Sequence, residues 1–329
     1  LLITFSPLIK NDCGTHNRKI LLDQGFDSIM FDPNAKVSQK LSKRFFIDRG
    51  NPKVAWDAGV NSIPLKYAIK FNIPFVIYAE HGESEYGGLI IDENSQRERT
   101  LREVIEHQIG DYPEIWQTDD ININDLDPYI YPSEEKLKQF NIKAFYFSYF
   151  FKWSMLENYN YVKKVMPSFK THPNKRTQGT FTDFDSLDDK IDCLYYYMQY
   201  IKFGFGRATR DSCRMVQNDQ MNREEAINLS RKYDSEFPED DFGEVLDFLD
   251  INQEEFEWPW NSVEETEVLT AGTTRYSMPY DAKTINMNTF RIKRNATLNV
   301  GTEKLKVMSY EEFLEKHADY EYNTETTGV

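Results

Sequence analysis

The chain has 329 residues, of which 40% are hydrophobic and 15% aromatic, so it is predicted to fold as a packed globular protein rather than stay disordered. The formal net charge of −15 repels nucleic acid and anionic membranes, which predicts no nucleic-acid partner. No run of about 18 apolar residues is present, which predicts no membrane insertion, and three scattered cysteines are typical of a reduced, cytoplasmic protein.

The first half of the chain alternates apolar runs with amphipathic stretches. Strands are predicted at residues 1–6, 27–32, 73–80 and 142–150, and helices at residues 16–25, 35–50 and 59–72. Alternating strands and helices predict an α/β fold with a parallel sheet. Because ligands bind at the carboxyl ends of parallel strands, Ser6, Asn34 and the loop "EHGESEYGG" (80–88) are the expected site.

The second half is predicted to be mainly helical. A polar excursion covers about residues 92–132 and contains a predicted helix at 97–110. From Lys152 to about Phe256 the pattern is almost wholly helical, with one helix capped by Asp185 or Ser186 and another starting at Asn222. The last 70 residues are rich in Thr and Asn. We therefore expect an α/β domain at 1–152, a helical region at 153–257 and a β-rich or loosely ordered tail at 258–329.

The loop at 80–88 carries acids directly after a predicted strand. Glu83 and Glu85 in this position can hold Mg²⁺ bridged to phosphates, since that ion binds through a few carboxylates and keeps its waters. The alternative interpretation is an ordinary polar loop at a strand end.

The stretch from Tyr200 to Ala226 concentrates basic residues in an acidic chain. It lacks the third glycine and the preceding strand of a dinucleotide-binding fingerprint. On a helix, Arg207, Arg210 and Arg214 share one face, and the two preceding glycines, Gly204 and Gly206, allow a bend. Such a row suits an anionic ligand, but a solvated face paired with acids such as Asp211 has the same spacing, so both interpretations stay open.

Several blocks, in this order, resemble the N-acetyl sugar amidotransferase family, a branch of the PP-loop ATP pyrophosphatases. The resemblance covers about residues 1–257. It is carried by "LLITFSPLI", "GFDSIMFDPNAKV", "KFNIPFVIYAEHGESEYGG", "FYFSYFFKW", "GTFTDFDSLDDKID" and, above all, "YIKFGFGRATRDSCRMVQNDQMNREEAINLSRKYDSEFPE".

The resemblance implies a PP-loop (HUP-like) α/β domain with a helical C-terminal region, and an enzyme of surface-glycan biosynthesis. It would use ATP and Mg²⁺ to adenylate the N-acetyl group of a nucleotide-linked sugar. Ammonia would then displace AMP and give an acetamidino sugar for O-antigen, capsule or flagellin glycan. The resemblance also implies partner subunits, a glutaminase and a cyclase-like protein, that supply the ammonia.

Matching positions assign roles to individual residues. The resemblance implies nucleotide or floor contacts for Ser6, Asn34 and the 80–88 loop, phosphate or sugar-nucleotide contacts for the basic stretch, and a further cationic contact for Arg176. The residues so implied are Ser6, Asn34, Gly82, Glu83, Glu85, Tyr86, Gly87, Arg176, Lys202, Gly204, Gly206, Arg207 and Arg210, of which Lys202, Arg207 and Arg210 are the expected catalytic residues.

The sequence departs from the family pattern in two places. The family's SGGxDS pyrophosphate loop, the strand before it and a cysteine-rich segment are absent, and the tail after about Trp258 has no counterpart. The strand at residues 1–6 then corresponds to the family's second strand. We therefore expect an N-terminally incomplete chain that is inactive alone, because the backbone amides of that loop cradle pyrophosphate.

Two other functions remain open from the sequence. A PP-loop enzyme of the tRNA-thiolation type predicts a basic RNA-binding surface, which a net charge of −15 does not favour. A non-catalytic subunit that binds a sugar nucleotide predicts that the pyrophosphate loop is missing from the gene itself.

Overall fold

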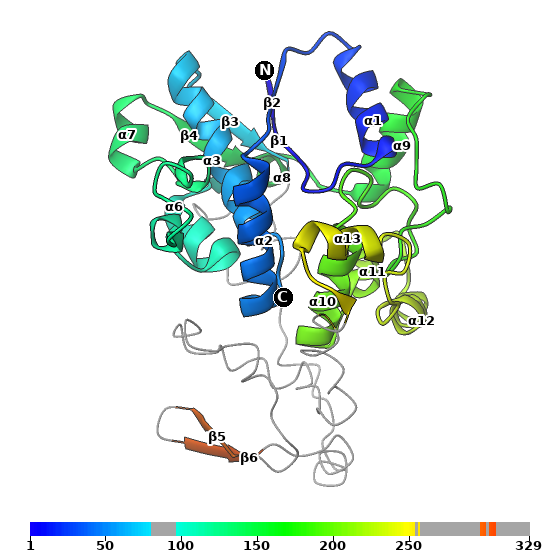
Figure 1. The fold of residues 1–329 in the computed structure, drawn as a ribbon. Coiled ribbons are helices and arrows are strands. Elements are labelled where there is room, and N and C mark those ends of the chain that lie inside the picture. Colours follow the sequence, from blue (N-terminus) through cyan, green and yellow to red (C-terminus); the bar gives the residue numbers. More distant parts are fainter. Residues whose placement is uncertain (80–96, 254–255, 257–296, 301–302, 307–329) are drawn as a thin grey trace. The chain divides into compact units, whose positions relative to one another are not determined.

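The computed structural model describes residues 1–79, 97–253, 256, 297–300 and 303–306 (Figure 1). The chain divides into two compact units, Leu1–Asn252 and Gln253–Val329. In the second unit, β5 (Thr297–Val300) and β6 (Glu303–Lys306) form an antiparallel hairpin. All other elements named below belong to the first unit, which is an α/β structure.

The strands of the first unit form two parallel pairs. β1 (Leu2–Phe5) pairs with β2 (Ser28–Phe31), and β3 (Phe75–Tyr78) pairs with β4 (Lys143–Tyr146). Within the described ranges, no strand hydrogen-bonds to both pairs. The parallel α/β arrangement predicted from the sequence is thus confirmed, as two short sheets rather than one continuous sheet.

Three long helices follow β1 and β2, close to where the sequence predicts them. α1 (Asp12–Leu22) is capped by Asn11, whose side chain accepts from Gly14 N. α2 (Ala35–Arg49) is capped by Asn34 and ends at Gly50 in the left-handed conformation. α3 (Val54–Phe71) starts five residues before its predicted beginning and packs against both β1 and β3. One helix therefore supports both strand pairs.

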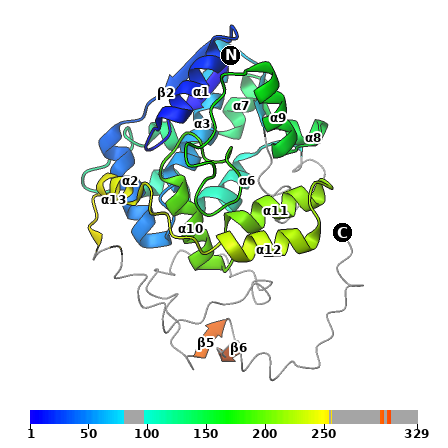
Figure 2. The ribbon, with the colours of Figure 1, turned by 90° about the vertical axis from the view of Figure 1, so that its right-hand side faces the viewer.

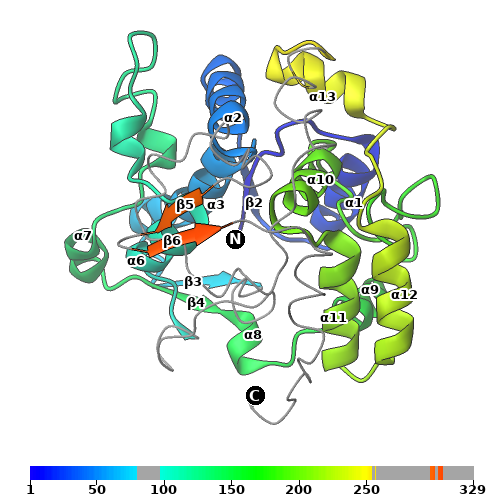
Figure 3. The same ribbon diagram turned by 90° about the horizontal axis from the view of Figure 1, so that it is seen from below.

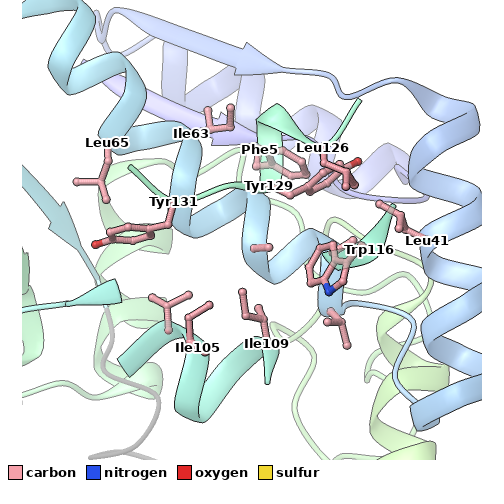
Figure 4. Packing of buried hydrophobic residues seen from close by; sticks show 14 of the residues in the cluster. Phe5, Leu41, Ile63, Leu65, Ile105, Ile109, Trp116, Leu126, Tyr129 and Tyr131 are labelled. Atoms are coloured by element: carbon pink, nitrogen blue, oxygen red, sulfur yellow. The ribbon is translucent and has the colours of Figure 1, made fainter. Parts of the chain in front are cut away.

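The core lies between α2, α3, the strands and the segment that follows β3. Phe5 contacts the ring of Tyr129 at a centroid distance of 6.1 Å, and Trp116 packs edge-on against Phe45 at 4.8 Å. Leu41 and Leu65 are fully buried. Figure 4 shows part of this cluster, including Phe5, Leu41, Leu65, Trp116 and Tyr129. Residues from 97–131, predicted as an excursion from the sheet, thus supply a wall of the core.

Short elements connect β3 to the C-terminal helices. The helix predicted at 97–110 forms as one turn, α6 (Leu101–Glu103), that continues as a π-helix, η1 (Val104–Ile109). Two 3₁₀ turns follow, η2 (Pro113–Trp116) and η3 (Asp127–Tyr129), and then α7 (Glu134–Gln139). The strand predicted at 142–150 is wrong in its second half, because the chain leaves β4 after Tyr146 and turns into α8 (Phe147–Phe150).

The C-terminal part of the first unit is built from five helices. They are α9 (Met155–Val165), α10 (Asp192–Phe203), α11 (Arg207–Gln217), α12 (Arg223–Tyr233) and α13 (Phe242–Leu249). α11 and α12 lie side by side (Figure 2, Figure 3). Asn222 caps α12 as predicted, accepting from Glu225 N at 2.9 Å. The prediction of almost continuous helix is wrong at 166–191, where the chain forms neither helix nor strand.

That irregular segment is tied to the chain that follows β1. The Asp189 carboxylate accepts from Leu8 N and Ile9 N, each at 2.9 Å, and Lys190 N donates to Ile9 O. A Cβ on Gly14 would lie 2.4 Å from the Cα of Asp188, so only glycine allows this approach. The predicted helix caps, Asp185 and Ser186, are wrong: α10 starts after Ile191 without a side-chain cap.

The contact between α3 and β1 also requires a glycine. A Cβ on Gly59 would lie 2.3 Å from two ring carbons of Phe5, which is itself buried. Gly59→Ala is therefore expected to lower the free energy of unfolding by about 1–3 kcal/mol, as measured by urea denaturation. Gly243→Ala is the matched control, since Gly243 is exposed in α13 with nothing near its Cβ position. This substitution is expected to raise the free energy of unfolding by about 0.5–1 kcal/mol, because alanine favours a helix more than glycine does. Equal effects of the two substitutions would contradict this packing.

Candidate functional site

Ser6 and Asn34 lie where the first two strands end. Ser6 N donates to Phe31 O across the ends of β1 and β2, and Ser6 O accepts from Trp56 Nε1 at 2.9 Å. The side chain of Asn34 accepts from the first backbone N–H groups of α2. Both residues are therefore at the carboxyl edge predicted from the sequence, and each has a structural hydrogen bond there.

A buried ion cluster, the Lys53 cluster, lies beside this edge. Lys53 pairs with Asp192, and its Nζ lies 3.9 Å from an oxygen of Asp189, with all three side chains buried. Its Nζ also lies 4.0 Å from the centre of the Trp56 ring. Burial alone would lower the pKa of Lys53, but the two carboxylates outweigh it and raise that pKa well above its usual value. Lys53 is therefore a permanent buried cation.

A second buried ion cluster, the Arg207 cluster, surrounds the first residue of α11. The Arg207 guanidinium pairs with Asp185 and, at 2.9 Å, with Asp211 one turn along the helix. Thr180 donates to the other oxygen of Asp211 at 2.6 Å. Arg207 is only 5% exposed. Of the two interpretations of the arginine row, pairing with acids describes Arg207, although the pair is buried rather than solvated.

Tyr196 of α10 packs against the Arg207 cluster and is close enough to the Lys53 cluster to interact electrostatically with Lys53 and Asp192. Its ring is 4.5 Å from the Arg207 guanidinium and 5.4 Å from that of Arg210, and its hydroxyl accepts from Ser186 at 3.1 Å. Arg210 also donates to the neutral side chain of Gln199 at 3.3 Å. Arg210 thus contacts Tyr196 and Gln199, and its charge also acts on Asp185.

Carboxylates occupy the predicted anion-binding positions around α11. Asp234 accepts from Thr209 N at 2.9 Å and so covers the start of the helix. A Cβ on Gly206 would lie 2.8 Å from Asp234 O, so this glycine serves helix packing. Arg176 pairs with Glu236, which also accepts from Gly179 N. In this conformation Arg176, Arg207 and the α11 start therefore do not fit a phosphate ligand.

Lys202 and Gly204 lie at the far end of α10. Gly204 ends α10 in the left-handed conformation, and the half-buried Lys202 lies in the field of Arg49. Burial lowers the pKa of Lys202 to about 8, and Arg49 acts in the same direction. Arg49 and Asn34 are at opposite ends of α2, about 20 Å apart at 1.5 Å per residue. The structure therefore does not bring Lys202 together with Asn34.

A polar stripe on α3 was missed at the sequence level. Lys53, Asp57 and Asn61 stand at i, i+4 and i+8, on one face of a helix whose other residues are mostly apolar. Asn61 Nδ2 donates to Gln108 Oε1 at 2.8 Å, and Lys53 belongs to the cluster described above. The spacing was visible in the sequence, and it is the signal that would have found these residues.

Carboxyl groups outnumber cations in the two clusters. Asp189 and Asp192 lie around Lys53, and Asp185 and Asp211 lie around Arg207, with Arg210 also acting on Asp185. Burial raises the pKa of Asp185 to about 7 and that of Asp189 to about 6, against the neighbouring cations, which lower both. Burial also raises the pKa of Asp57 to about 7. Bound protons therefore balance part of the negative charge.

These raised pKa values make stability depend on pH. Carboxyl groups with a pKa near 6–7 in the native state and near 4 when unfolded bind more protons in the native state. Their contribution is complete below about pH 4 and is lost as the pH rises through 6–7. Urea denaturation is expected to give a lower free energy of unfolding at pH 8 than at pH 5, with the loss falling between pH 5 and about 7 at up to about 1 kcal/mol per pH unit for each group. A flat or rising profile would contradict this.

Some predicted site residues lie outside the described residues. These are the loop residues Gly82, Glu83, Glu85, Tyr86 and Gly87, and with them the proposed Mg²⁺ ligands. In the part of the chain that the structure describes, His, Cys, Asp and Glu side chains form no group that could hold a metal ion. Nor does any described helix have the length and apolar character needed to cross a bilayer.

Comparison with known proteins bears on the part of the chain that contains α10–α13. A search of curated proteins found no match. Residues 178–289, which include Asp185, Asp189, Arg207 and Asp234, match the family model described as LPS biosynthesis protein WbpG-like, C-terminal domain, and this match supports a role in LPS biosynthesis. The match extends past residue 257, where the sequence predicted that the likeness to a known family would end.

Proposed function

We propose that the chain belongs to a cytoplasmic, ATP-dependent amidotransferase that converts the N-acetyl group of a nucleotide-linked sugar into an acetamidino group during LPS biosynthesis. The observation that carries this proposal is the match of residues 178–289 to the WbpG-like C-terminal domain. The two parallel strand pairs, with Ser6 and Asn34 at their carboxyl edge, support it further.

The proposed reaction overcomes the low electrophilicity of an amide. ATP, as a substrate, converts the amide oxygen into a phosphoryl ester and pyrophosphate leaves. Ammonia from a glutaminase and a cyclase-like partner then attacks the amide carbon, and AMP leaves with the former amide oxygen. Magnesium and cationic side chains would stabilise the charge that develops on pyrophosphate.

The contacts of the described residues refine the roles within this proposal. Ser6 and Asn34 remain at the nucleotide edge, and Glu83 with Glu85 remain the proposed Mg²⁺ ligands. In this proposal Arg210, which lies over the Tyr196 ring and donates to Gln199, keeps the sugar-nucleotide contact that the resemblance implies. Arg207 instead supports the site by holding Asp185 and Asp211.

The activity requires a pyrophosphate loop of the SGGxDS type. Residues 1–329 contain no such loop, so the reaction is assigned to this chain together with the polypeptide that carries the loop. Experiments on activity therefore need the complete enzyme.

ATP–pyrophosphate exchange tests the proposal. The complete enzyme is incubated with ATP, Mg²⁺, labelled pyrophosphate and, in turn, a panel of UDP- and CMP-linked N-acetyl sugars. Exchange that depends on one of these sugars is the expected result, and exchange with none of them overturns the proposal.

A non-catalytic sugar-nucleotide-binding subunit is the second candidate. This function needs no SGGxDS loop, and residues 1–329 contain none. Calorimetric binding of a nucleotide sugar without any exchange would support this second function over the first.

A further inference from the structure

One turn of α3 joins the carboxyl ends of the two strand pairs. Trp56 Nε1 donates to Ser6 O, just after β1, at 2.9 Å. The hydroxyl of Tyr78, the last residue of β3, donates to Asn61 O at 3.0 Å. Asp57 lies between Trp56 and Asn61, and therefore between the two strand ends at which a parallel α/β protein binds its ligands.

Asp57 is the member of the polar stripe whose side chain is left without a protein partner. Lys53 pairs with Asp192, and the Asn61 amide donates both to Gln108 and to the backbone oxygen of Asp57. The Asp57 carboxyl, in contrast, makes no hydrogen bond or ion pair with any described residue. The Asp57 side chain is half-buried, and its oxygens are not among the fully buried polar atoms without a partner, so a ligand that donates a proton or an N–H group can reach it.

The charges around Asp57 define what that ligand can be. Lys53 and Arg99 act on its carboxyl as cations, while Asp192 acts as a like charge from α10. The Tyr195 phenol of α10 is also within the range of its charge. Arg99 is itself engaged, donating to Gln108 at 2.8 Å and lying over the Tyr78 ring. The Asp57 carboxylate would repel a phosphate. A small cationic nitrogen donor, in contrast, would form a hydrogen bond and an ion pair with it.

We propose that Asp57 binds the ammonium ion and removes its proton before the nitrogen attacks the activated amide. This inference rests on the proposed amidotransferase function. The carboxylate takes one proton from ammonium and becomes a neutral acid. The ammonia released forms a C–N bond to the amide carbon, and the C–O bond breaks as AMP leaves with its electron pair. The Asp57 acid then returns its proton to solvent.

The protonation behaviour of Asp57 agrees with this role. Burial raises its pKa to about 7, partly offset by Lys53 and Arg99. A general base works best when its pKa lies near the working pH, since it is then both unprotonated in a large fraction of molecules and basic enough to take a proton.

The Asp57→Asn variant of the complete enzyme tests the proposal in two assays. Sugar-dependent ATP–pyrophosphate exchange is expected to stay near the wild-type rate, because that step needs no ammonium. Amidine formation from ammonium chloride at pH 7 is expected to fall about 10²–10⁴-fold. The deficit should shrink as the pH approaches the pKa of ammonium, where free ammonia is present without a base.

A stability measurement separates a catalytic from a structural role. Because a buried carboxylate without a partner disfavours folding at pH 8, Asp57→Asn is expected to leave the urea midpoint unchanged or raise it. Asp48→Asn is the control, since Asp48 is an exposed acid on α2 that pairs with Arg44. It should change neither assay.

The outcomes distinguish the two proposals. Normal amidination by Asp57→Asn, with an unchanged pH profile, overturns the assignment of Asp57 while normal exchange leaves the amidotransferase function intact. A large drop in the urea midpoint would show that Asp57 is structural, and would also overturn its assignment. Absence of exchange in the wild-type enzyme overturns the amidotransferase function, and the ammonium site with it.

Discussion

Replacing Lys53 with methionine is expected to lower the free energy of unfolding by about 3–5 kcal/mol. Methionine keeps much of the length and the contact with the Trp56 ring, but it removes the cation that Asp192 and Asp189 share. Both carboxyl groups are buried, and a buried charge without its partner carries the full desolvation penalty. Urea denaturation at pH 8 measures the effect.

An exposed ion pair provides the control for Lys53. Lys40 pairs with Asp120, and both side chains are about half exposed. Lys40→Met is therefore expected to change the free energy of unfolding by less than about 1 kcal/mol. The Lys53→Met effect should also be smaller at pH 5, because Asp189, with a pKa of about 6, then carries a proton. A loss below about 1 kcal/mol at pH 8 would contradict the role assigned to this cation.

Arg207→Met is expected to have an effect of similar size, about 3–5 kcal/mol. The substitution leaves Asp185 and Asp211 buried without their common cation, and it removes the contact with the Tyr196 ring. Thr180 still donates to Asp211, so one hydrogen bond of the cluster remains. Chemical denaturation of the complete protein measures the loss.

Two further variants test whether this loss arises from the buried carboxyl groups. Arg231→Met, at an exposed position of α12, is expected to stay within about 0.5 kcal/mol of the wild type. The double variant Arg207→Met/Asp185→Asn should recover part of the stability, because one uncompensated charge is gone. If Arg207→Met keeps its stability but loses nucleotide binding, Arg207 binds an anionic ligand, as the sequence suggested, and has no structural role.

Features determined by neighbouring residues could be predicted from the sequence. Asn222 caps α12 through a bond to Glu225 N, and Gly50 ends α2, because both depend only on residues a few positions away. The parallel direction of the strand pairs followed from the strand–helix alternation. The roles of Arg210, Lys202 and the strand-end residues stay predictions.

Features determined by distant residues could not be predicted. Asp185 was predicted to be a helix cap, but it forms an ion pair with Arg207, 22 positions along the chain. Asp189 lies shortly before α10 in the sequence, yet its carboxylate accepts from two backbone N–H groups after β1. Periodicity gives no information on which acid will meet which cation in the folded core. The stripe with Asp57 was the exception, since its spacing was there to be noticed.

The bonds between Asp189 and the chain after β1 have a consequence for the order of folding. Leu8 and Asp189 are 181 positions apart, so their contact closes a very long loop. The chain loses the entropy of closing this loop before the hydrogen bonds between them can stabilise it. During synthesis, at roughly 5–20 residues per second, Leu8 emerges many seconds before Asp189 exists. Until then the segment after β1 has exposed amides and no partner. We therefore expect the predicted ligand edge to be among the last parts of the nascent chain to become ordered, and a chaperone that shields β1 to aid its maturation.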